Sequence, residues 1–547
     1  MLAAIWRDVL RVPAVGPDAN FFELGGDSIL SLQIVARAHQ AGYALTPRQI
    51  FSAPTIRGQA AVTTRVSTSP VAVDDESGAV PLTPIEHWFF KQDQPEPQHW
   101  NQSVVLELRH AISVERLGCA LAAVIARHGA FRLRFTRGAN AEWQQAYTSV
   151  VDRGPGVSLP EHPLESLTAV ATQLQASLDL AAGPLWRAAL FTGAKGVAPQ
   201  LFLVIHHLAV DGVSWRILAG DLAQACAQLA AGRSVELAPP AVSYATWARS
   251  LMVRAQTAEL RTELVHWRAL AGAEGALPRD FAAEAGASGV EAAETFNTEL
   301  DPAATVSLLR DAAATYRLRA DELLLAALAQ TLAAWTGRAA TVVSLENHGR
   351  EDLGDALDLS RTVGWFTSLY PLRLACATGT GPGELLTQTK EGLRAVPRHG
   401  VGFGLLSHLC ADETVRRELA ALPQAELCFN YLGQVDHTLG ADAPFAMVDA
   451  PTGPSSSPRG HRMHLIDINA IVVGGRLRVT WIYSGRVHRR ATIVREAEVF
   501  LAHVRTLLAH CASPAAGGLT PSDFTHVQLD ARELDALLDD LAEPAPN

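Results

Sequence analysis

Two histidines stand side by side at the end of an apolar run in LFLVIHHLAVDGVSW, residues 201–215. Imidazole changes charge near neutral pH, so a histidine in a crevice can donate or accept a proton. Neighbouring residues of a strand point to opposite faces, so only one of the pair can face a given crevice. We expect His207 to be that residue and His206 to be a hydrogen-bonded core residue. Asp211 and Gly212 are expected to hold the turn that follows, with Asp211 in a structural role.

A second group that could move protons is Glu346, which ends the apolar run TVVSLEN, residues 341–347. A single glutamate at such a place is ordinarily a solvated loop residue. Inside a crevice, burial would raise its pKa toward a range useful for proton transfer. Tyr431, at the end of LCFNY, is a further polar candidate, although packing in the structure explains it equally well. Asn430 is expected to support the site.

The stretch FFELGGDSIL, residues 21–30, contains a serine suited to carrying a phosphate ester. Its two glycines permit a tight turn, and Asp27 with Ser28 then begins a helix. The helix dipole and the free N–H groups at a helix start favour an anion there. The alternative is that Asp27 or Ser28 is only an N-cap, as helices commonly have.

Residues 1–66 have the pattern of a small four-helix unit, too small to hold a cleft. An apolar stripe at helical spacing marks the first helix, and it comprises Leu2, Ile5, Trp6, Val9 and Leu10. A second helix is expected over 28–40, ended by Gly42, and Thr46-Pro47 and Thr55 are expected to begin two short helices. Residues 67–79 are polar and non-periodic, which indicates a linker.

Residues 80–525 alternate between strand and helix patterns, so we expect an α/β unit. Strands are expected at 103–109, 201–207, 341–347 and 477–485, the last after a hairpin turn at Gly474-Gly475. A long helix is expected to start with Asp321 as N-cap and to end at Gly337. Because this length is large for one core, we expect two lobes with a crevice between them, the N-lobe at about 80–255 and the C-lobe at about 256–525.

Composition excludes several functional classes. The chain has 547 residues and a formal net charge of −11, which argues against nucleic acid as a partner. No run of 18 apolar residues and no secretory leader are visible, so we expect a cytoplasmic protein with no membrane span. The six cysteines form no C-x-x-C pair and are expected to be buried thiols, and no metal site is expected.

The H-H-x-x-x-D-G motif resembles the condensation superfamily, whose fold is two chloramphenicol-acetyltransferase-like lobes. Amide-forming condensation domains and epimerization domains both carry this motif. An ordered series of further motifs resembles epimerization domains: PLTPIEHWFF (81–90), HWNQS (99–103), SLENHGRE (344–351), RTVGWFTSLYPLRL (361–374), PRHGVGFG (397–404) and FNYLGQ (429–434). GGDS in a four-helix unit resembles the peptidyl carrier domain of nonribosomal peptide synthetases.

This resemblance implies an isomerase that epimerizes the Cα of an aminoacyl or peptidyl thioester, reversibly from L to D. The thioester would hang from a 4′-phosphopantetheine arm on Ser28. Glu346 would exchange the Cα proton from one lobe, and His207, on the other, would be the opposite acid/base or would stabilise the enolate oxygen. Implied partners are an upstream adenylation domain, a downstream condensation domain of another module and a phosphopantetheinyl transferase. No adenylation domain is present, so the chain resembles a fragment of a longer synthetase.

Two positions depart from the family pattern. Asn347 stands where glycine is usual, and because asparagine tolerates left-handed backbone angles, we expect the turn that aims Glu346 to be kept. Phe403 stands where tyrosine is frequent, which removes a hydroxyl.

Two other functions remain open at this stage: an amide-forming condensation domain, and a non-catalytic module that only docks a carrier.

The acidic tail, residues 526–547, has a leucine stripe and Asp530 with Glu533 in a capping-box pattern. This tail is expected to form a helix that either docks a downstream synthetase or packs back on its own domain.

Overall fold

The structure is a computed structural model that describes residues 1–65, 76–149, 157–282, 288–354, 357–435, 443–514, 516–524 and 532–533. Most of the expected linker and nearly all of the acidic tail, including its leucine stripe, lie outside the described residues. Within the described residues, no helix is long and apolar enough to cross a membrane.

The first 65 residues form the four-helix unit that the sequence predicts. The helices are α1 (Leu2–Leu10), α2 (Ser28–Gln40), α3 (Pro47–Ser52) and α4 (Ile56–Val62), and β1 (Tyr43–Ala44) pairs with β2 (Thr64–Arg65). Their caps are the expected ones: the side chains of Asp27, Thr46 and Thr55 accept hydrogen bonds from backbone N–H groups in the first turns of α2, α3 and α4. A separate core around Trp6, Phe21 and other apolar residues holds the unit together.

The first lobe is built on a five-stranded sheet in the order β14-β4-β9-β8-β7. Its strands are β4 (Asn101–Leu108), β7 (Glu161–Pro163), β8 (Trp186–Thr192), β9 (Gln200–His206) and β14 (Phe445–Val448). The helices α6 (Val114–Arg127) and α8 (Gly212–Ala230) pack against each other beside this sheet. Strand β14 comes from the later part of the chain, although the sequence division places these residues with the second lobe.

The second lobe is built on a six-stranded sheet in the order β10-β16-β15-β13-β11-β12. Its strands are β10 (Ala293–Glu299), β11 (Ala340–Asn347), β12 (Ser368–Ala375), β13 (Leu427–Gln434), β15 (Ile466–Val473) and β16 (Arg476–Ser484). The long helices α14 (Ala320–Thr336) and α18 (Arg490–Cys511) contact each other, and α14 also lies against β11 and β12. The parallel pairing of β13 with β11 brings Asn430 beside Glu346.

The other elements complete the lobes. A small sheet contains β3 (Gly78–Val80), β6 (Trp143–Tyr147) and β5 (Leu133–Arg137). The remaining α-helices are α5 (Pro84–Lys91), α7 (Leu167–Gln175), α9 (Tyr244–Arg254), α10 (Ala258–Arg261), α11 (Leu264–Arg268), α12 (Pro302–Val306), α13 (Ala312–Tyr316), α15 (Pro382–Arg394), α16 (Val401–Gly404) and α17 (Glu413–Ala420).

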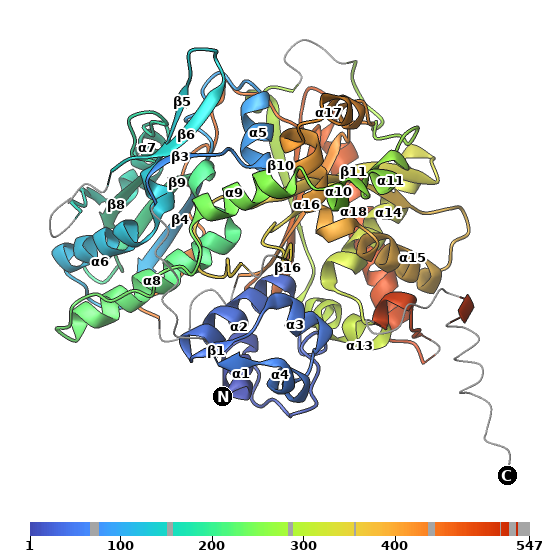
Figure 1. The fold of residues 1–547 in the computed structure, drawn as a ribbon, viewed down its shortest axis with the longest axis horizontal. Helices are drawn as coiled ribbons and strands as arrows, with labels where there is room; N and C mark the ends of the chain where they lie inside the picture. Colours follow the sequence, from blue (N-terminus) through green and yellow to red (C-terminus); the bar gives the residue numbers. More distant parts are fainter. Residues whose placement is uncertain are drawn as a thin grey trace.

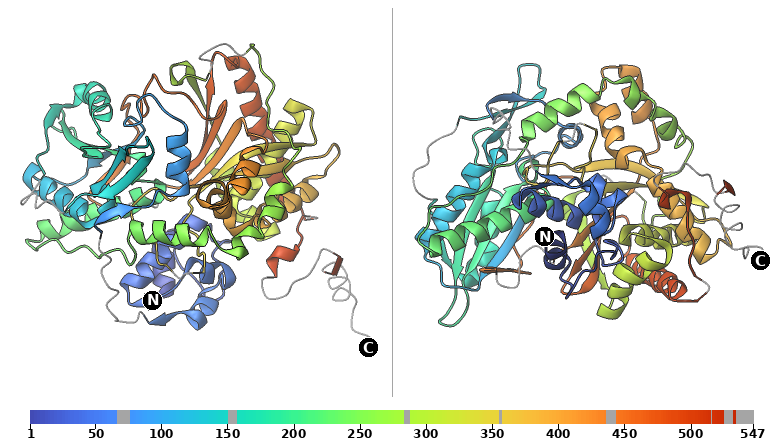
Figure 2. Two further views of the ribbon diagram at one scale, coloured as in Figure 1. Left: turned by 45° about the horizontal axis from the view of Figure 1, so that its top comes forward. Right: turned by 60° about the horizontal axis from the view of Figure 1, so that its bottom comes forward.

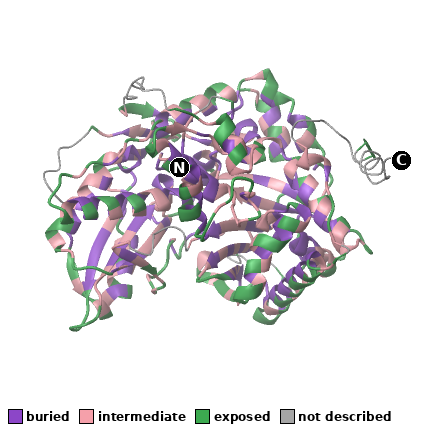
Figure 3. Ribbon diagram, turned by 90° about the horizontal axis from the view of Figure 1, so that it is seen from below, coloured by how far each residue is buried: buried purple, intermediate pink, exposed green. Residues whose placement is uncertain are grey.

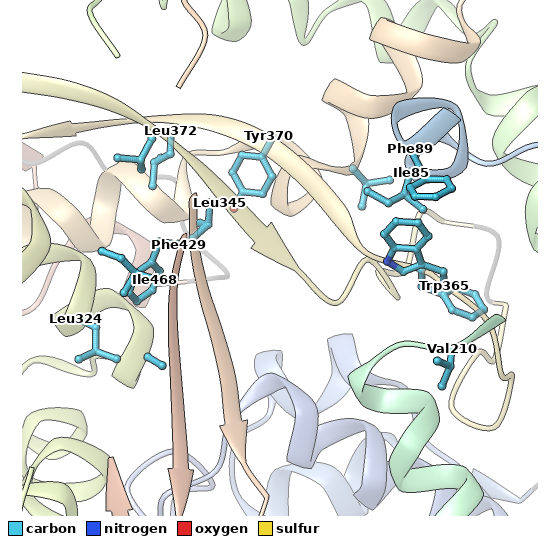
Figure 4. Packing of buried hydrophobic residues seen from close by; sticks show 14 of the residues in the cluster. Ile85, Phe89, Val210, Leu324, Leu345, Trp365, Tyr370, Leu372, Phe429 and Ile468 are labelled. Carbon is cyan, nitrogen blue, oxygen red and sulfur yellow. The ribbon is translucent and has the colours of Figure 1, made fainter. Parts of the chain in front are cut away.

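The four-helix unit lies across the junction of the two lobes. Figure 1 shows α1–α4 below that junction, with the first lobe on the left and the second on the right, and Figure 2 shows the same arrangement from two other directions. Buried residues run along the strands of both lobes, whereas the outer helices are exposed on their far sides (Figure 3). Figure 4 shows Trp365 near Phe89 and Val210, apart from the Leu345 and Phe429 cluster of the second sheet.

One local expectation was wrong, and the reason given for another does not hold. Asp321 is not the N-cap of its helix: α14 begins at Ala320 after Arg319, and Asp321 lies in the first turn. Asn347 does not need a left-handed backbone, because it is the last residue of the extended strand β11. The positive φ falls two residues later, at Gly349, with φ 66°. The asparagine side chain instead donates hydrogen bonds to Tyr370 Oη at 2.9 Å and to the carbonyl oxygen of His399 at 3.3 Å.

Candidate active site

A cavity of about 130 Å³ lies where the four-helix unit meets both lobes. Its wall includes Ser28 from the start of α2, His207 from the end of β9 and Glu346 from the end of β11. The other lining residues come from the four-helix unit and from both lobes: Asp27, Ile29, Gln102, Asp211, Gly212, Val213, Arg319, Ala320, Asp321, Leu345, Asn347, His348, Thr367, Phe429, Asn430, Tyr431 and Leu432. The structure therefore brings together three residues that lie more than 130 positions apart in the sequence.

The imidazole of His207 is held by both of its ring nitrogens. Strand β9 ends at His206, and His207 begins a short 3₁₀ turn. Nδ1 lies 2.8 Å from the carbonyl oxygen of Val210, which can only accept, so Nδ1 carries a proton. Nε2 lies 2.9 Å from the amide nitrogen of Gln102 and accepts from it. Burial lowers the pKa of His207, so the ring is neutral with its lone pair on Nε2.

The Gln102 amide is oriented by a second hydrogen bond, in which Trp215 Nε1 donates to Gln102 Oε1 at 2.8 Å. This bond leaves the NH₂ group of Gln102 to face His207. The indole of Trp365 covers the imidazole, with ring centroids 4.3 Å apart. The His207 ring is thus fixed in one tautomer and one orientation by residues that lie far from it in sequence.

Glu346 comes from the second lobe and is half-buried in the wall of the cavity. Asn430 Nδ2 donates to Glu346 Oε2 at 2.7 Å, and the Cys428 thiol lies 3.7 Å from Oε1. Burial and, to a smaller extent, the negative charge of Asp467 together raise the pKa of Glu346 to about 7. A carboxyl with a pKa of about 7 can both take and give a proton near neutral pH.

A polar cluster lies behind Glu346. Asp467 pairs with His464 at 3.3 Å and with Arg462 at 2.7 Å. The potential ligand atoms of Cys428, His464 and Asp467 lie within 4.8 Å of one another, a spacing that a metal ion could use. Burial raises the pKa of the Cys428 thiol well above its ordinary value, which disfavours the thiolate that a metal ion needs.

Asp211 ties the first lobe to the second. Its carboxylate accepts from Ser214 N at 2.7 Å as the N-cap of α8, and from Arg350 Nη2 at 3.1 Å and 3.2 Å. The Arg350 side chain is fully buried. Gly212 and Val213, in the first turn of α8, line the cavity, where helix N–H groups have no partner within the helix. The positive end of α8 thus faces the cavity.

The remaining expected residues occupy different positions. His206 is buried away from the cavity: Nε2 donates to Pro97 O at 2.8 Å, Nδ1 accepts from Leu208 N at 3.1 Å, and burial lowers its pKa to about 3. Tyr431 lines the cavity, and its hydroxyl has no hydrogen-bond partner among the described residues. Phe403 lies outside this cavity, with its ring 5.1 Å from that of Trp267.

The four-helix unit contacts the lobes on both sides of Ser28. Gln434 Nε2 donates to the carbonyl oxygen of Gly25 at 2.9 Å, and His39 pairs with Asp358 at 2.8 Å. Ser28 is half-buried at the N-terminus of α2 and lines the same cavity as His207 and Glu346. A phosphodiester on Ser28 would meet the free N–H groups of α2, so the residues present fit a phosphopantetheine arm that enters this cavity.

Several functional contacts were not expected from the sequence. Gln102 lies in the HWNQS motif, but nothing in that motif indicates a bond to His207. Arg350 lies in the SLENHGRE motif, yet its pairing with Asp211 depends on the packing of two lobes. Asp467 and His464 had no sequence signal beyond their polarity in an apolar segment.

Two protein-family models match this chain. Residues 76–529 match the condensation domain family, and residues 2–62 match the phosphopantetheine attachment site family. The chain belongs to the condensation-domain family and carries a phosphopantetheine-binding carrier domain at its N-terminus. This combination of domains is that of nonribosomal peptide synthetases.

The most similar solved structures include the epimerization domain from the third module of tyrocidine synthetase B. It is 31% identical, with a TM-score of 0.73, and the match covers 80% of this chain and 97% of that one. Among curated relatives, a component of the linear gramicidin synthase of Brevibacillus parabrevis is 41% identical over 98% of this chain. Tyrocidine synthase 1 of the same organism is 32% identical over 99% of this chain. The chain spans only 7% and 50% of the lengths of these two relatives.

Proposed function

We propose that this chain epimerizes the Cα of an aminoacyl or peptidyl thioester carried on Ser28. The observation that carries the proposal is that Ser28, His207 and Glu346 line one small cavity. The similarity to an epimerization domain that covers nearly all of that domain supports it. Upstream and downstream modules and a phosphopantetheinyl transferase are the expected partners.

The arm, when present, supplies a thioester, whose carbonyl makes the neighbouring Cα–H acidic enough to remove. The remaining chemistry belongs to the side chains of this chain. His207 and Glu346 come from different lobes, which suits proton transfer at opposite faces of one carbon. The negative charge that develops on the thioester oxygen would be stabilised by the first-turn N–H groups of α8.

Proton balance follows from the states of the two groups. In one stereochemical direction, the Gln102 amide releases His207 Nε2, which takes the Cα proton while the carboxylic acid of Glu346 gives its proton to the other face. The site is then an imidazolium and a carboxylate, which is the starting state for the opposite direction. Exchange with water restores the first state after a net turnover. Tyr431, whose hydroxyl has no hydrogen-bond partner in the described part of the chain, is a third polar group for the substrate.

The test is chiral analysis of an amino acid released from the carrier. A phosphopantetheinyl transferase loads the full chain from L-leucyl-coenzyme A. After timed quenching, the thioester is hydrolysed to release free leucine. We expect D-leucine and Cα deuterium incorporation in D₂O. Glu346→Gln should lower both rates by about 10²–10⁴-fold, the range for loss of one acid/base group. The exposed Glu413→Gln is the matched control and should leave both rates unchanged.

Amide formation is the second function, because the matched family includes condensation domains. A donor thioester on a separate carrier distinguishes the two functions. Dipeptide formation without D-leucine or deuterium incorporation would replace epimerization by condensation. Absence of all three products would leave a docking module.

A further inference from the structure

A second cavity, of about 440 Å³, adjoins the active-site cavity in the first lobe. One wall is the face of the five-stranded sheet on which Val104 of β4 lies opposite Leu203 of β9. The other walls come from α6 and α8, with Ile125, Trp215 and Ala219 among the lining residues. This cavity has no role in the proton transfers described above.

The walls of this cavity are mainly apolar but incompletely covered. Val104, Leu203, Ile125 and Trp215 are only half-buried, although each packs on the hydrophobic core. Exposed apolar area inside a concave site of a few hundred cubic ångströms is typical of a small-molecule or chain-binding pocket. The chemistry of the wall therefore favours an apolar ligand.

Two polar atoms in the wall have no partner. Asn101 is 7% exposed, and its Oδ1 is buried without a hydrogen bond among the described residues, while its Nδ2 donates to Gln175 O at 2.8 Å. Arg216 Nη1 is likewise buried and unpaired in that part of the chain, while Nη2 donates to Leu432 O at 3.2 Å. A buried polar group without a partner costs free energy that a bound ligand can recover. One free acceptor and one free donor match the N–H and C=O of a peptide group.

The two cavities are neighbours, because Gln102, Gly212 and Leu432 line both of them. Gln102 is the residue whose amide holds His207. A substrate whose Cα lies between His207 and Glu346 would therefore have the apolar cavity directly beside it.

We propose that this apolar cavity binds the upstream peptide chain of a peptidyl thioester, with apolar side chains against the walls and one peptide group on Asn101 and Arg216. The inference rests on the proposed function and specifies its substrate as peptidyl and apolar. The carbonyl carbon of the epimerized residue is bonded to the sulfur of the arm. The upstream residues are attached to its α-nitrogen, and no part of the site described above binds them. A cavity of this volume also exceeds the needs of a single side chain.

The test compares three thioesters loaded on the full chain from synthetic coenzyme A derivatives: L-leucyl, L-valyl-L-leucyl and L-aspartyl-L-leucyl. Initial rates of D-leucine formation are measured for each one. We expect the valyl-leucyl thioester to react at least ten-fold faster than either of the others. Equal rates for all three would overturn the proposal while leaving epimerization intact. No D-leucine from any of them would instead contradict the proposed function.

Cavity variants test the location. Ala219→Trp fills the cavity from α8 and should lower the ratio of valyl-leucyl to leucyl rates about ten-fold. Ala227→Trp makes the same change on an exposed position of α8 and should keep the parent ratio. Leu203→Asn changes the polarity of the wall at similar side-chain size and should lower the ratio as well. It is the second variant if thermal melting shows that Ala219→Trp does not fold. An unchanged ratio in a folded cavity variant would overturn the proposal.

The alternative occupant of this cavity is the side chain of the epimerized residue itself. The same variants are therefore loaded with L-leucyl and L-alanyl thioesters. If Ala219→Trp slows the leucyl thioester but not the alanyl thioester, the cavity binds that side chain, and the peptide assignment is wrong.

Discussion

The protonation of Glu346 is set by its surroundings as much as by its own chemistry. Asn430 and Cys428 contact its two oxygens, and Asp467 places a second negative charge nearby. Burial raises the pKa of this carboxyl most, the charge of Asp467 also raises it, and His464 and Cys428 lower it; the pKa of about 7 lies in the pH range where enzymes ordinarily work. His207 has the opposite shift, because burial disfavours its charged form.

At the residue scale, Asp467→Asn should move the pH dependence of epimerization. The proposed exchange needs one proton on the His207–Glu346 pair, so the rate should fall as pH rises through about 7, where Glu346 loses its proton. Removing the charge of Asp467 lowers the pKa of Glu346, and this basic limb should shift to lower pH. The pH profile of D-leucine formation measures it, with the exposed Asp449→Asn as control. A basic limb at the same pH in both variants would contradict the role of Asp467.

At the scale of elements, α8 is the point where the first lobe is tied to the second. Its N-cap, Asp211, accepts from Arg350, which also donates to the carbonyl oxygens of Leu359 and Thr362. Phe366 N donates to Asp211 at 3.2 Å as well. These bonds fix the segment that carries Trp365 over His207.

We expect Arg350→Met to destabilise the protein strongly. Removing one partner of a buried ion pair leaves an uncompensated charge and typically costs about 3–5 kcal/mol. Arg478→Met breaks an exposed pair with Glu299 and should cost less than about 1 kcal/mol. Urea denaturation followed by fluorescence gives both free energies of unfolding. Similar losses for the two variants would mean that the buried pair does not hold the lobes together.

At the scale of the whole molecule, the carrier domain lies over the active-site cavity, with Ser28 half-buried against both lobes. If Ser28 carries the arm as proposed, a transferase would reach this half-buried side chain only after the carrier has moved away. The His39–Asp358 pair is a polar contact that opposes this movement. The hydrogen bond to Asp358 raises the pKa of His39, so the pair contributes fully below the ordinary pKa of histidine and is lost as pH rises through the raised value.

Asp358→Asn should therefore speed modification of Ser28 by a phosphopantetheinyl transferase. A partly exposed pair is worth up to about 1 kcal/mol, which corresponds to roughly five-fold. The ratio of variant to parent rates, measured by intact mass, should be larger at pH 6 than at pH 8. Asp449→Asn serves as the control and should give a ratio of one. A ratio of one for Asp358→Asn at both pH values would show that this pair does not hold the carrier.

The sequence by itself determined the local features of this protein. The starts of α2, α3 and α4 depend on the side chains of Asp27, Thr46 and Thr55, which lie within three residues of the backbone groups that they cap. The end of β9, just before His207, and the end of β11, which carries Glu346, follow from apolar runs that stop at a polar turn. The two adjacent histidines also had different fates for a local reason, since neighbours at a strand end face opposite ways.

Only the tertiary structure decided which residues meet. Gln102 reaches His207 across paired strands, Arg350 reaches Asp211 across 139 positions, and Gln434 reaches Gly25 across 409. Such contacts depend on how sheets and helices from distant segments pack, and a periodic pattern in one segment carries no information about its partner in another. The pairing of β14 with β4 in the first sheet depends on strand register, and the raised pKa of Glu346 depends on burial. Register and burial are both properties of the assembled lobes.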